Sequence, residues 1–317
     1  MIKVAVIGLG SFGKKRLNAL IKNKKFSVVA INDIDRKLAY SLESVLNIKY
    51  KSIENILLDK NISCVFICVP NSLHKNYIFK FGNKNKIIFC EKPLCKNAWE
   101  AKKIYNFISK NKIRFQLGSN HRYFPSILYA QKLIKKSFGK ILSITGRIGH
   151  NGERINKSWF MKKKFSGGGT FLDNGCHLID IVTLFVSDIK KKFFIGVNSY
   201  WKHTNVNDNE ICVLSNKNKV LISLLSSWRL HAGYFFLEIN CENGFINIDG
   251  RIDAINNDKV IWKLKNYKKP KSINFSINKF SKLSYDLELD QFYNNIKLNK
   301  FSPNAKEAFK IMQIIDN

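Results

Sequence analysis

Short apolar runs alternate with amphipathic segments through the first 119 residues. Apolar residues that recur every three to four positions predict helices, and short apolar runs between them predict buried strands. The predicted strands cover residues 3–8, 26–32, 64–69, 87–90 and 114–118. The predicted helices cover residues 12–22, 36–46, 53–58, 72–81 and 98–110. This alternation indicates βαβ units around a parallel sheet, so the expected fold class is α/β.

The pattern changes after residue 119, where consecutive strands with brief connections predict a largely antiparallel sheet. The predicted strands cover residues 141–149, 193–201, 210–215, 220–228, 234–241, 244–248 and 260–265. The predicted helices cover residues 127–136, 284–298 and 304–315, and residues 167–186 are predicted to form a glycine-rich turn followed by a helix. We therefore expect two domains, residues 1–119 and residues 120–317, the second an α/β domain with a large, mostly antiparallel sheet.

A length of 317 residues suits two domains of ordinary size. No apolar run approaches the ~20 residues that cross a bilayer, so no membrane partner is expected. The first residues, Met1 to Gly8, have the pattern of a buried strand and not of a secretory leader. These features predict a cytoplasmic protein.

The seven cysteines form no C-x-x-C pair, the spacing expected of zinc or thioredoxin-like sites. Several stand in apolar strand patterns, where cysteine behaves as a small hydrophobic residue. We expect reduced, mostly buried thiols, no disulfide and no metal. The cysteines are Cys64, Cys68, Cys90, Cys95, Cys176, Cys212 and Cys241.

The formal net charge is +31, which could favour nucleic acid, an acidic membrane or an anionic substrate. Lysines are scattered through nearly every predicted element, without a basic stripe or a basic aromatic repeat, and they accompany abundant Asn and Ile. This pattern is typical of an AT-rich genome and argues against nucleic acid. An anionic substrate, such as a sugar phosphate or a nucleotide sugar, stays open.

Gly8, Gly10 and Gly13 form a G-x-G-x-x-G sequence directly after the first predicted strand and at the start of a helix. In that context the first glycine permits a tight turn, the second lets the backbone approach a pyrophosphate, and the third allows close packing of helix on strand. The chain has only 17 glycines, so a structural turn is the weaker interpretation. The motif predicts a Rossmann dinucleotide-binding domain.

Asp33 ends the second predicted strand, where a carboxylate accepts hydrogen bonds from the adenosine ribose hydroxyls and repels a 2′-phosphate. This position favours NAD as the cofactor. Arg36 follows closely and could bind a phosphate, so NADP stays possible. A helix N-cap is the structural alternative for Asp33.

Lys92 follows the fourth predicted strand within the sequence Glu91-Lys92-Pro93, at the edge where open α/β sheets bind ligands. A cis Lys92–Pro93 bond is expected there. Farther along, a glycine run leads into Asp173 and His177, which share a face of the predicted helix at a spacing of four residues. These side chains offer a cation, an acid and an imidazole.

Taken together, these motifs make the chain resemble the Gfo/Idh/MocA family of glucose-fructose oxidoreductase and inositol dehydrogenase. The resemblance covers nearly the whole chain and depends on the order of five motifs. They are the glycine loop, Val69-Pro70-Asn71-Ser72-Leu73-His74, Glu91-Lys92-Pro93, Asn120-His121-Arg122-Tyr123, and the glycine run with Asp173, His177 and Asp180. The family fold is a Rossmann domain followed by an α/β domain with an open sheet that often forms the oligomer contact.

The resemblance implies a role for each matching residue. The implied catalytic residues are Lys92, Asp173 and His177. The implied cofactor site comprises Gly8, Gly10, Ser11, Phe12, Gly13, Asp33, Pro70, Asn71, His74, Glu91 and Lys92. The substrate side would be lined by Asn120, Arg122, Asp173 and His177, and Trp159, which lies outside the five motifs, could wall a sugar site by aromatic stacking. Structural roles stay open for several of them: a cap for Asp173, packing for His74 and His177, a solvated charge for Lys92, and core filling for Trp159.

The chemistry of such a set is hydride transfer between nicotinamide and a secondary alcohol carbon. His177 suits the base that removes the hydroxyl proton, Lys92 would stabilise negative charge on that oxygen, and Asp173 would orient the imidazole. The expected partner is a sugar, cyclitol or nucleotide sugar, and the expected assembly is a homodimer or homotetramer through the C-terminal sheet. Two other functions stay open: a non-enzymatic dinucleotide sensor, and NAD-assisted glycoside hydrolysis.

Overall fold

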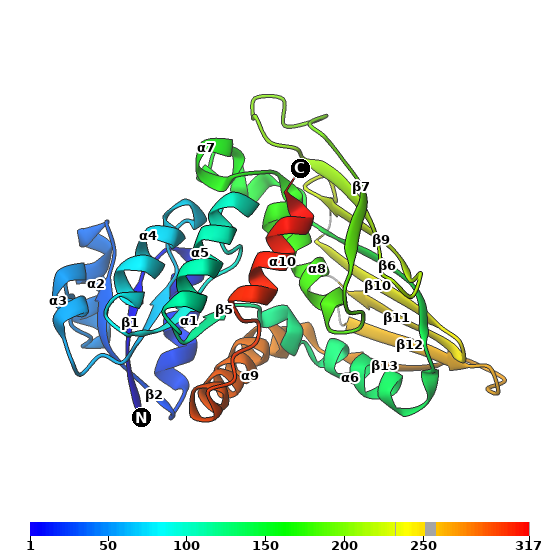
Figure 1. Ribbon diagram of the computed structural model, residues 1–317, viewed down its shortest axis with the longest axis horizontal. Coiled ribbons are helices and arrows are strands. Elements are labelled where there is room, and N and C mark those ends of the chain that lie inside the picture. Colours follow the sequence, from blue (N-terminus) through cyan, green and yellow to red (C-terminus); the bar gives the residue numbers. More distant parts are fainter. Residues whose placement is uncertain (232, 251–257, 317) are drawn as a thin grey trace. The chain divides into compact units, whose positions relative to one another are not determined.

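The computed structural model describes residues 1–231, 233–250 and 258–316. These residues divide into two compact units (Figure 1). The first unit contains residues 1–119 and 285–313, and the second contains residues 120–284 with the residues from Ile314 onward.

The first unit contains a five-stranded sheet in the order β2–β1–β3–β4–β5, in which every pair is parallel. The strands are β1 (Ile2–Ile7), β2 (Phe26–Asn32), β3 (Cys64–Ile67), β4 (Ile87–Cys90) and β5 (Phe115–Leu117). The helices are α1 (Ser11–Lys22), α2 (Arg36–Leu46), α3 (Ile53–Leu58), α4 (Asn71–Gly82) and α5 (Ala98–Lys110). The predicted parallel α/β fold of this half is confirmed.

Helix α9 (Ile277–Leu298) completes the core of the first unit. The ring of Phe292 lies 5.7 Å from that of Phe66 and 5.1 Å from that of Phe89, and all three side chains are buried. Helix α10 (Ala305–Ile315) also contributes, because Phe309 stacks on Tyr105 of α5 at 5.5 Å.

The predicted boundaries need a correction here, because the second expected domain, residues 120–317, includes a segment that belongs to the first unit. That segment is residues 285–313. The physical reason is the apolar face of α9, which buries Leu289 and Phe292 against the first sheet. An amphipathic pattern shows that a helix has a face to bury, but not which sheet it will cover.

The second unit contains an eight-stranded sheet in the order β13–β12–β11–β10–β6–β9–β8–β7. Its strands are β6 (Ile141–Gly149), β7 (Lys190–Val197), β8 (Asn209–Ser215), β9 (Leu221–Ser227), β10 (Tyr234–Cys241), β11 (Gly244–Gly250), β12 (Asp258–Leu264) and β13 (Lys271–Phe275). The pairing is antiparallel except between β6 and β9, which run parallel. The large, mostly antiparallel sheet is therefore confirmed.

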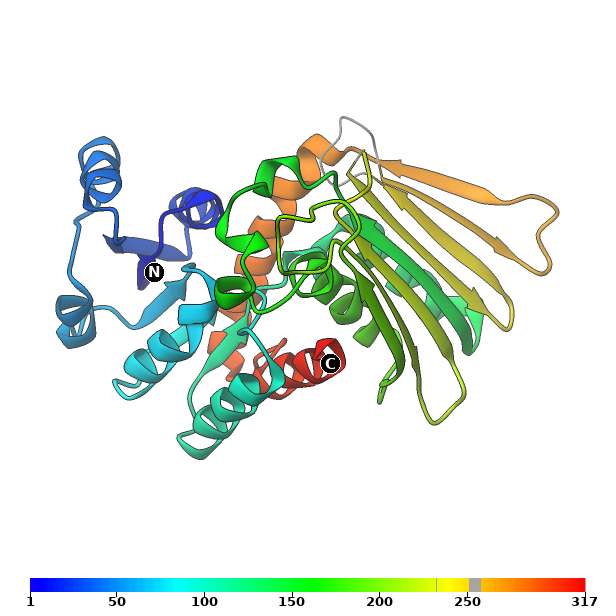
Figure 2. The same ribbon diagram turned by 90° about the horizontal axis from the view of Figure 1, so that it is seen from above.

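One face of this sheet is covered by helices. The α-helices of this unit are α6 (Pro125–Leu133), α7 (Lys163–Ser166) and α8 (Cys176–Thr183); the π-helical turn η2 (Ile134–Phe138) follows α6, and the π-helical turn η5 (Phe171–Gly175) leads into α8. Short 3₁₀ turns are η1 (Asn120–Tyr123), η3 (Glu153–Ile155) and η4 (Trp159–Met161). Figure 2 shows α8 against one face of the sheet, while no helix of the described part of this unit covers the other.

The strand predicted over residues 193–201 of the second unit covers residues 190–197 in the structure, as β7. The glycine turn and helix predicted over 167–186 are present: the glycine run is not helical, and the helix after it begins with the π-turn η5. Strand β13 is not expected from the sequence, because its side chains are almost all exposed and show no apolar alternation.

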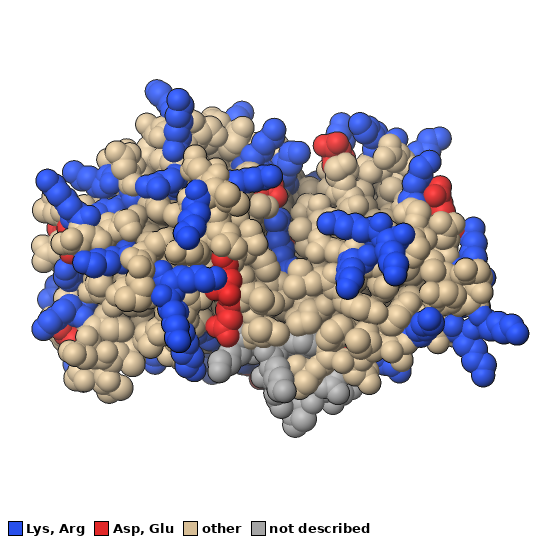
Figure 3. Space-filling model, turned by 90° about the horizontal axis from the view of Figure 1, so that it is seen from below, with Lys and Arg blue, Asp and Glu red and all other residues tan. Residues whose placement is uncertain are grey.

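On one face of the molecule, the charged side chains are scattered as the sequence predicts (Figure 3). Figure 3 shows lysine and arginine spread over one face of the molecule without a single stripe. Across residues 1–231, 233–250 and 258–316, no helix is long and apolar enough to cross a membrane. All seven cysteines are free thiols, and all but Cys68 are buried.

Candidate active site

Four sequence motifs of the first unit meet at the carboxyl edge of its parallel sheet. Gly8 follows β1, Asp33 follows β2, Pro70 lies just beyond β3, and Glu91 follows β4. Backbone bonds hold them in register: the Gly8 amide donates to the Asn32 carbonyl at 2.8 Å. Ligands of open α/β sheets bind at this edge.

The glycine loop shows a separate requirement at each of its three glycines. Gly8 has a φ of 91°, and a Cβ there would lie 2.7 Å from the carbonyl carbon of Cys68. A Cβ on Gly13 would lie 1.9 Å from the Gly8 oxygen. A Cβ on Gly10 would meet no atom within 4 Å. The fold itself therefore needs Gly8 and Gly13, whereas Gly10 faces open space.

The open space at Gly10 fits a dinucleotide pyrophosphate. Gly10 is the N-cap of α1, which begins at Ser11, and no side chain caps the first turn. The amides at such a helix start are suited to binding phosphate oxygens. Phe12, in this first turn, is 37% exposed, and the Lys92 ammonium lies 5.7 Å from its ring centroid.

Asp33 is tied to the glycine loop. Its Oδ2 accepts a hydrogen bond from the Leu9 amide at 2.5 Å, and its Oδ1 accepts one from the Asp35 amide at 2.8 Å. The N-cap of α2 is Asp35, whose carboxylate accepts from the Leu38 amide at 3.1 Å. The N-cap alternative for Asp33 is therefore wrong, and its carboxylate connects the ends of β1 and β2.

His74 braces the turn that carries Lys92. Its Nε2 lies 2.9 Å from the Val69 carbonyl oxygen, and its Nδ1 lies 3.0 Å from that of Pro93. The ring is buried, and burial lowers the pKa of His74. The Lys92–Pro93 bond is cis, as expected.

Pro70 and Asn71 support the same turn from the start of α4. Pro70 is the N-cap residue of this helix. The side-chain Nδ2 of Asn71 donates a hydrogen bond to the Cys95 carbonyl oxygen at 3.3 Å. His74 and Asn71 thus contact backbone groups near Lys92, and their predicted contacts with a cofactor stay predictions.

Arg16 lies behind this turn in a buried charged cluster. Its guanidinium donates to the Glu91 carboxylate and lies 2.5 Å from that of Glu288. The rings of Phe89 and Tyr285 lie 4.6 and 4.5 Å from its guanidinium carbon. Burial raises the pKa of Glu288 to about 7. Glu91, a predicted cofactor residue, is therefore engaged by a protein cation.

In the second unit, η5 positions Asp173 and leads directly into α8, which carries His177. The Phe171 amide donates to the Glu210 carboxylate at the start of this turn. The glycines around it permit close packing, since a Cβ on Gly175 would lie 2.5 Å from the Phe171 ring. Such π-turns within helices occur frequently at functional sites.

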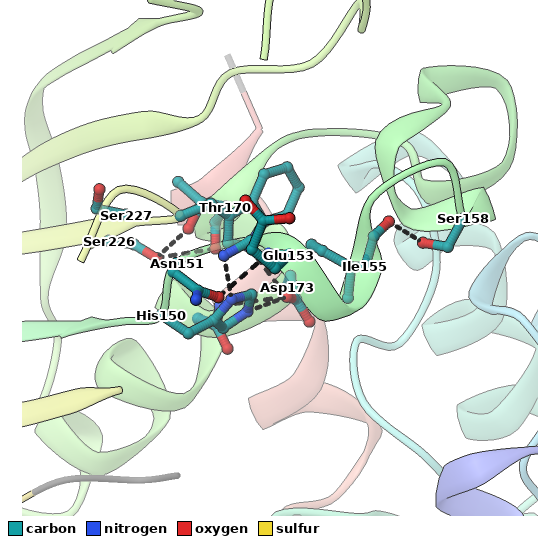
Figure 4. A network of polar contacts seen from close by, with 12 residues as sticks. His150, Asn151, Glu153, Ile155, Ser158, Thr170, Asp173, Ser226 and Ser227 are labelled. Carbon is teal, nitrogen blue, oxygen red and sulfur yellow. Dashed lines mark hydrogen bonds and ion pairs between the residues drawn. The ribbon is translucent and has the colours of Figure 1, made fainter. Parts of the chain in front are cut away.

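The Asp173 carboxylate is buried among polar groups (Figure 4). Its Oδ2 accepts hydrogen bonds from the Asn174 side-chain Nδ2 at 3.2 Å and from the Trp228 indole at 3.3 Å. His150 Nε2 lies 3.8 Å from the same oxygen. His150 Nδ1 accepts from the Gly152 amide at 2.9 Å, so a neutral ring carries its proton on Nε2, the nitrogen nearer Asp173.

The sequence motifs contain neither His150 nor Trp228. Each follows the end of a strand, β6 or β9, and the two strands pair in parallel with Gly149 opposite Ser227. Because the strands run in parallel, the residues that follow them emerge at the same edge of the sheet. Only the parallel pairing of β6 with β9 indicates that these residues lie together. The sequence pattern does not reveal this pairing, because consecutive strands with short connections predict antiparallel neighbours.

His177 is buried and stacks on His121 of η1 with ring centroids 3.7 Å apart and planes 9° apart. Arg122, the next residue, forms two hydrogen bonds with Asp180 of α8, at 2.8 and 2.5 Å. Two neighbouring residues of η1, His121 and Arg122, thus contact the face of α8 that carries the predicted catalytic residue His177.

The other predicted substrate residues are placed as follows. The Asn120 side chain donates to the Ser284 hydroxyl at 3.1 Å. Trp159 is half-buried and stacks on Phe160 at 3.9 Å. These contacts, like the Arg122–Asp180 pair, are made within the second unit, and a substrate role for Asn120, Arg122 and Trp159 stays a prediction.

Two family models match this chain. Residues 2–119 match the oxidoreductase family with an NAD-binding Rossmann fold, and residues 127–247 match the GFO/IDH/MocA C-terminal domain. The chain belongs to the Gfo/Idh/MocA family.

Curated relatives of this Gfo/Idh/MocA protein include an uncharacterized oxidoreductase of Streptococcus pneumoniae, 24% identical over 79% of this chain and 72% of the relative. A second is 2,7-anhydro-N-acetylneuraminate hydratase of Escherichia coli, 29% identical over 60% of this chain and 50% of the relative. Among solved structures, levoglucosan dehydrogenase in complex with NADH and levoglucosan superposes with a TM-score of 0.87 at 19% identity, covering 99% of this chain and 96% of that one. This last similarity shows the shared fold.

Membership of the Gfo/Idh/MocA family confirms the predicted class, an oxidoreductase with an NAD-binding Rossmann domain.

Proposed function

We propose that this Gfo/Idh/MocA protein is an NAD-dependent dehydrogenase that transfers a hydride between nicotinamide and a secondary alcohol carbon of a carbohydrate-like substrate. The substrate classes are sugars, cyclitols and nucleotide sugars. One observation carries the proposal: the second unit buries the Asp173 carboxylate four residues before His177, in a chain whose first unit has an intact glycine loop.

The first unit would hold the cofactor by its pyrophosphate at Gly10 and by its adenosine ribose at Asp33. NAD supplies the carbon that accepts or gives the hydride. The Asp33 carboxylate favours a ribose diol over a 2′-phosphate, which supports NAD over NADP. Arg36, the first residue of α2, is exposed and is the residue that could bind NADP instead.

The second unit would handle the proton. Oxidation of an alcohol releases the hydroxyl proton as hydride leaves carbon, so a neutral imidazole is needed as the acceptor. His177 is that acceptor in the proposal. The Asp173 carboxylate, which accepts hydrogen bonds from the Asn174 side chain and the Trp228 indole, would orient a donor or stabilise the imidazolium. Lys92 would stabilise negative charge on the substrate oxygen.

A second candidate function follows from the hydratase of Escherichia coli among the relatives. In an NAD-assisted hydration or glycoside hydrolysis, the cofactor is reduced and reoxidised within each turnover. The same base and the same cofactor site would serve that reaction. A non-enzymatic sensor is less well supported, because the chain retains Lys92, Asp173 and His177 together.

A turnover screen separates these functions. The purified protein is incubated with NAD⁺ and with levoglucosan, myo-inositol, a sugar acid, a nucleotide sugar or 2,7-anhydro-N-acetylneuraminate. Accumulation of NADH with one of them is the expected result. Product formation without net NADH would favour hydration or hydrolysis, and tight NAD binding without any turnover would favour the sensor.

The proposal includes a homo-oligomer in the cytoplasm. Free cysteines persist in a reducing compartment, which supports the location. The uncovered face of the large sheet carries exposed apolar side chains on β7: Phe193, Ile195 and Val197 are 54, 49 and 46% exposed. A second copy of the chain is the proposed partner of this face.

A further inference from the structure

The ring of His121 stacks on the ring of the proposed base, His177. Its imidazole centroid lies 3.7 Å from that of His177, and the two planes are nearly parallel. Its ring also contacts Phe124, with centroids 4.4 Å apart. Both histidines are buried, at 7 and 6% exposure. The His121 ring is therefore fixed within the interior of the second unit and in contact with the face of His177.

The backbone that carries His121 is fixed independently. The buried Arg122 guanidinium and the Asp180 carboxylate form a two-bonded ion pair between η1 and α8. Asp180 lies three residues after His177, on the same side of α8. The His121–His177 stack and the Arg122–Asp180 pair therefore connect η1 to α8 at two points one helical turn apart.

We propose that His121 is a positioning residue, whose ring sets the plane of the His177 imidazole and so the direction of its nitrogen atoms. The second side-chain torsion of histidine has a broad energy profile, so the helix alone does not fix the ring plane. A flat ring stacked on one face restricts that torsion. Proton transfer depends on this direction, since a displacement of about 1 Å can lower a rate about 10²-fold.

This inference rests on the proposed function, and its test uses three variants with the substrate found in the turnover screen. His121→Ala removes the stacked ring, and we expect kcat to fall about 10- to 100-fold while the KM for NAD⁺ is unchanged. His121→Phe keeps a flat ring and should restore most of kcat. His203→Ala, at an exposed histidine of the same unit, is the control and should be normal.

A double variant shows whether His121 acts through His177. If it does, His121→Ala has no further effect in a His177→Ala background. Additive losses would overturn the proposal, as would normal kcat in His121→Ala with an inactive His177→Ala protein. Equal losses in His121→Ala and His121→Phe would also overturn it, since they would assign the effect to the nitrogen atoms of His121. Normal turnover of His177→Ala would instead refute the proposed base.

A measurement without turnover completes the test. In the folded wild type, the ring current of His121 shifts the NMR signals of the His177 ring protons. His121→Ala should move these signals and His121→Phe should keep them shifted, with circular dichroism verifying that both variants are folded. Unmoved signals in folded His121→Ala would overturn the stack itself, even if the protein turns over no substrate in the screen.

Discussion

The guanidinium of Arg16 and the carboxylate of Glu288 lie 2.5 Å apart inside the first unit. The same guanidinium binds Glu91, next to Lys92, and the Ser119 amide donates to Glu288. One cation therefore serves two buried carboxylates, and burial raises the pKa of Glu288 to about 7 from an ordinary value of 4.5. The buried cluster next to Lys92 thus contains a carboxyl group whose pKa is raised to about 7.

A pH-dependent stability follows from Glu288. A raised pKa means that the folded state binds the proton of Glu288 more tightly than the unfolded state does. Protonation of Glu288 therefore stabilises the fold fully below pH 4.5, and this stabilisation is lost as the pH rises through about 7. In the wild type, the free energy of unfolding should decrease by roughly 1–3 kcal/mol between pH 5 and 8 through this group, and Glu288→Gln should remove that decrease. Urea unfolding at several pH values checks it, with Glu54→Gln at an exposed position as the control. Equal pH dependence in wild type and Glu288→Gln would contradict the expectation.

The glycine loop gives a test of cofactor binding that leaves the fold intact. Gly10→Val places methyl groups where a Cβ meets no protein atom within 4 Å, so folding should be normal. NADH binding should be lost, because the side chain would occupy the space proposed for the pyrophosphate. Fluorescence titration with NADH measures this. Unchanged affinity in folded Gly10→Val protein would remove the site from this loop.

Cofactor preference should respond to Asp33. Asp33→Ser removes the charge that opposes a 2′-phosphate, so the ratio of NAD to NADP affinity should fall. Because Asp33 also binds the Leu9 amide, NAD affinity itself should decrease. Titrations with both cofactors measure the ratio. A wild type that prefers NADP would mean that Arg36 dominates.

The chemical step should depend on His177 and on Lys92. His177→Ala and Lys92→Ala should each lower kcat by about 10² to 10⁴-fold while NADH still binds. In the oxidation direction, turnover of the wild type should also fall at acidic pH, because an imidazolium cannot accept the substrate proton. Steady-state kinetics with NADH titration measures both effects. Near-normal kcat in His177→Ala would refute its assignment as the base.

The proposed oligomer can be tested at the exposed apolar residues of β7, on the uncovered face of the large sheet. Ile195→Asp places a charge among the exposed apolar residues of β7 and should shift the protein toward monomer. Lys217→Asp, in the turn between β8 and β9, is the control and should leave the assembly unchanged. Light scattering after size exclusion measures the mass. The same mass for wild type and Ile195→Asp would exclude this face as the contact.

The sequence predicts the first sheet well for a physical reason. Strands such as β3 and β4 are buried on both faces and therefore appear as continuous apolar runs bounded by turns. Strand β13 has exposed side chains and gives no such signal. The glycine loop is predictable because its spacing is local, as is the separation of Asp173 and His177.

The rest of the candidate site depends on contacts between distant segments. His150 and Trp228 reach Asp173 through the parallel pairing of β6 with β9, which no local pattern encodes. Arg16 resembles a solvated charge on an amphipathic helix until Glu91 and Glu288 are placed around it. Sequence motifs therefore predict the candidate catalytic and cofactor-binding residues. The residues that contact and position them become visible only in the tertiary structure.

Helix α9 has a consequence for how the protein is made. Leu289 and Phe292, which complete the core of the first unit, are synthesised after the whole of residues 120–284. While the second unit is being translated, Phe66 and Phe89 lack this partner and expose apolar surface, a state prone to aggregation. The first unit can finish folding only late in synthesis, and a fragment of residues 1–119 would retain the same uncovered surface.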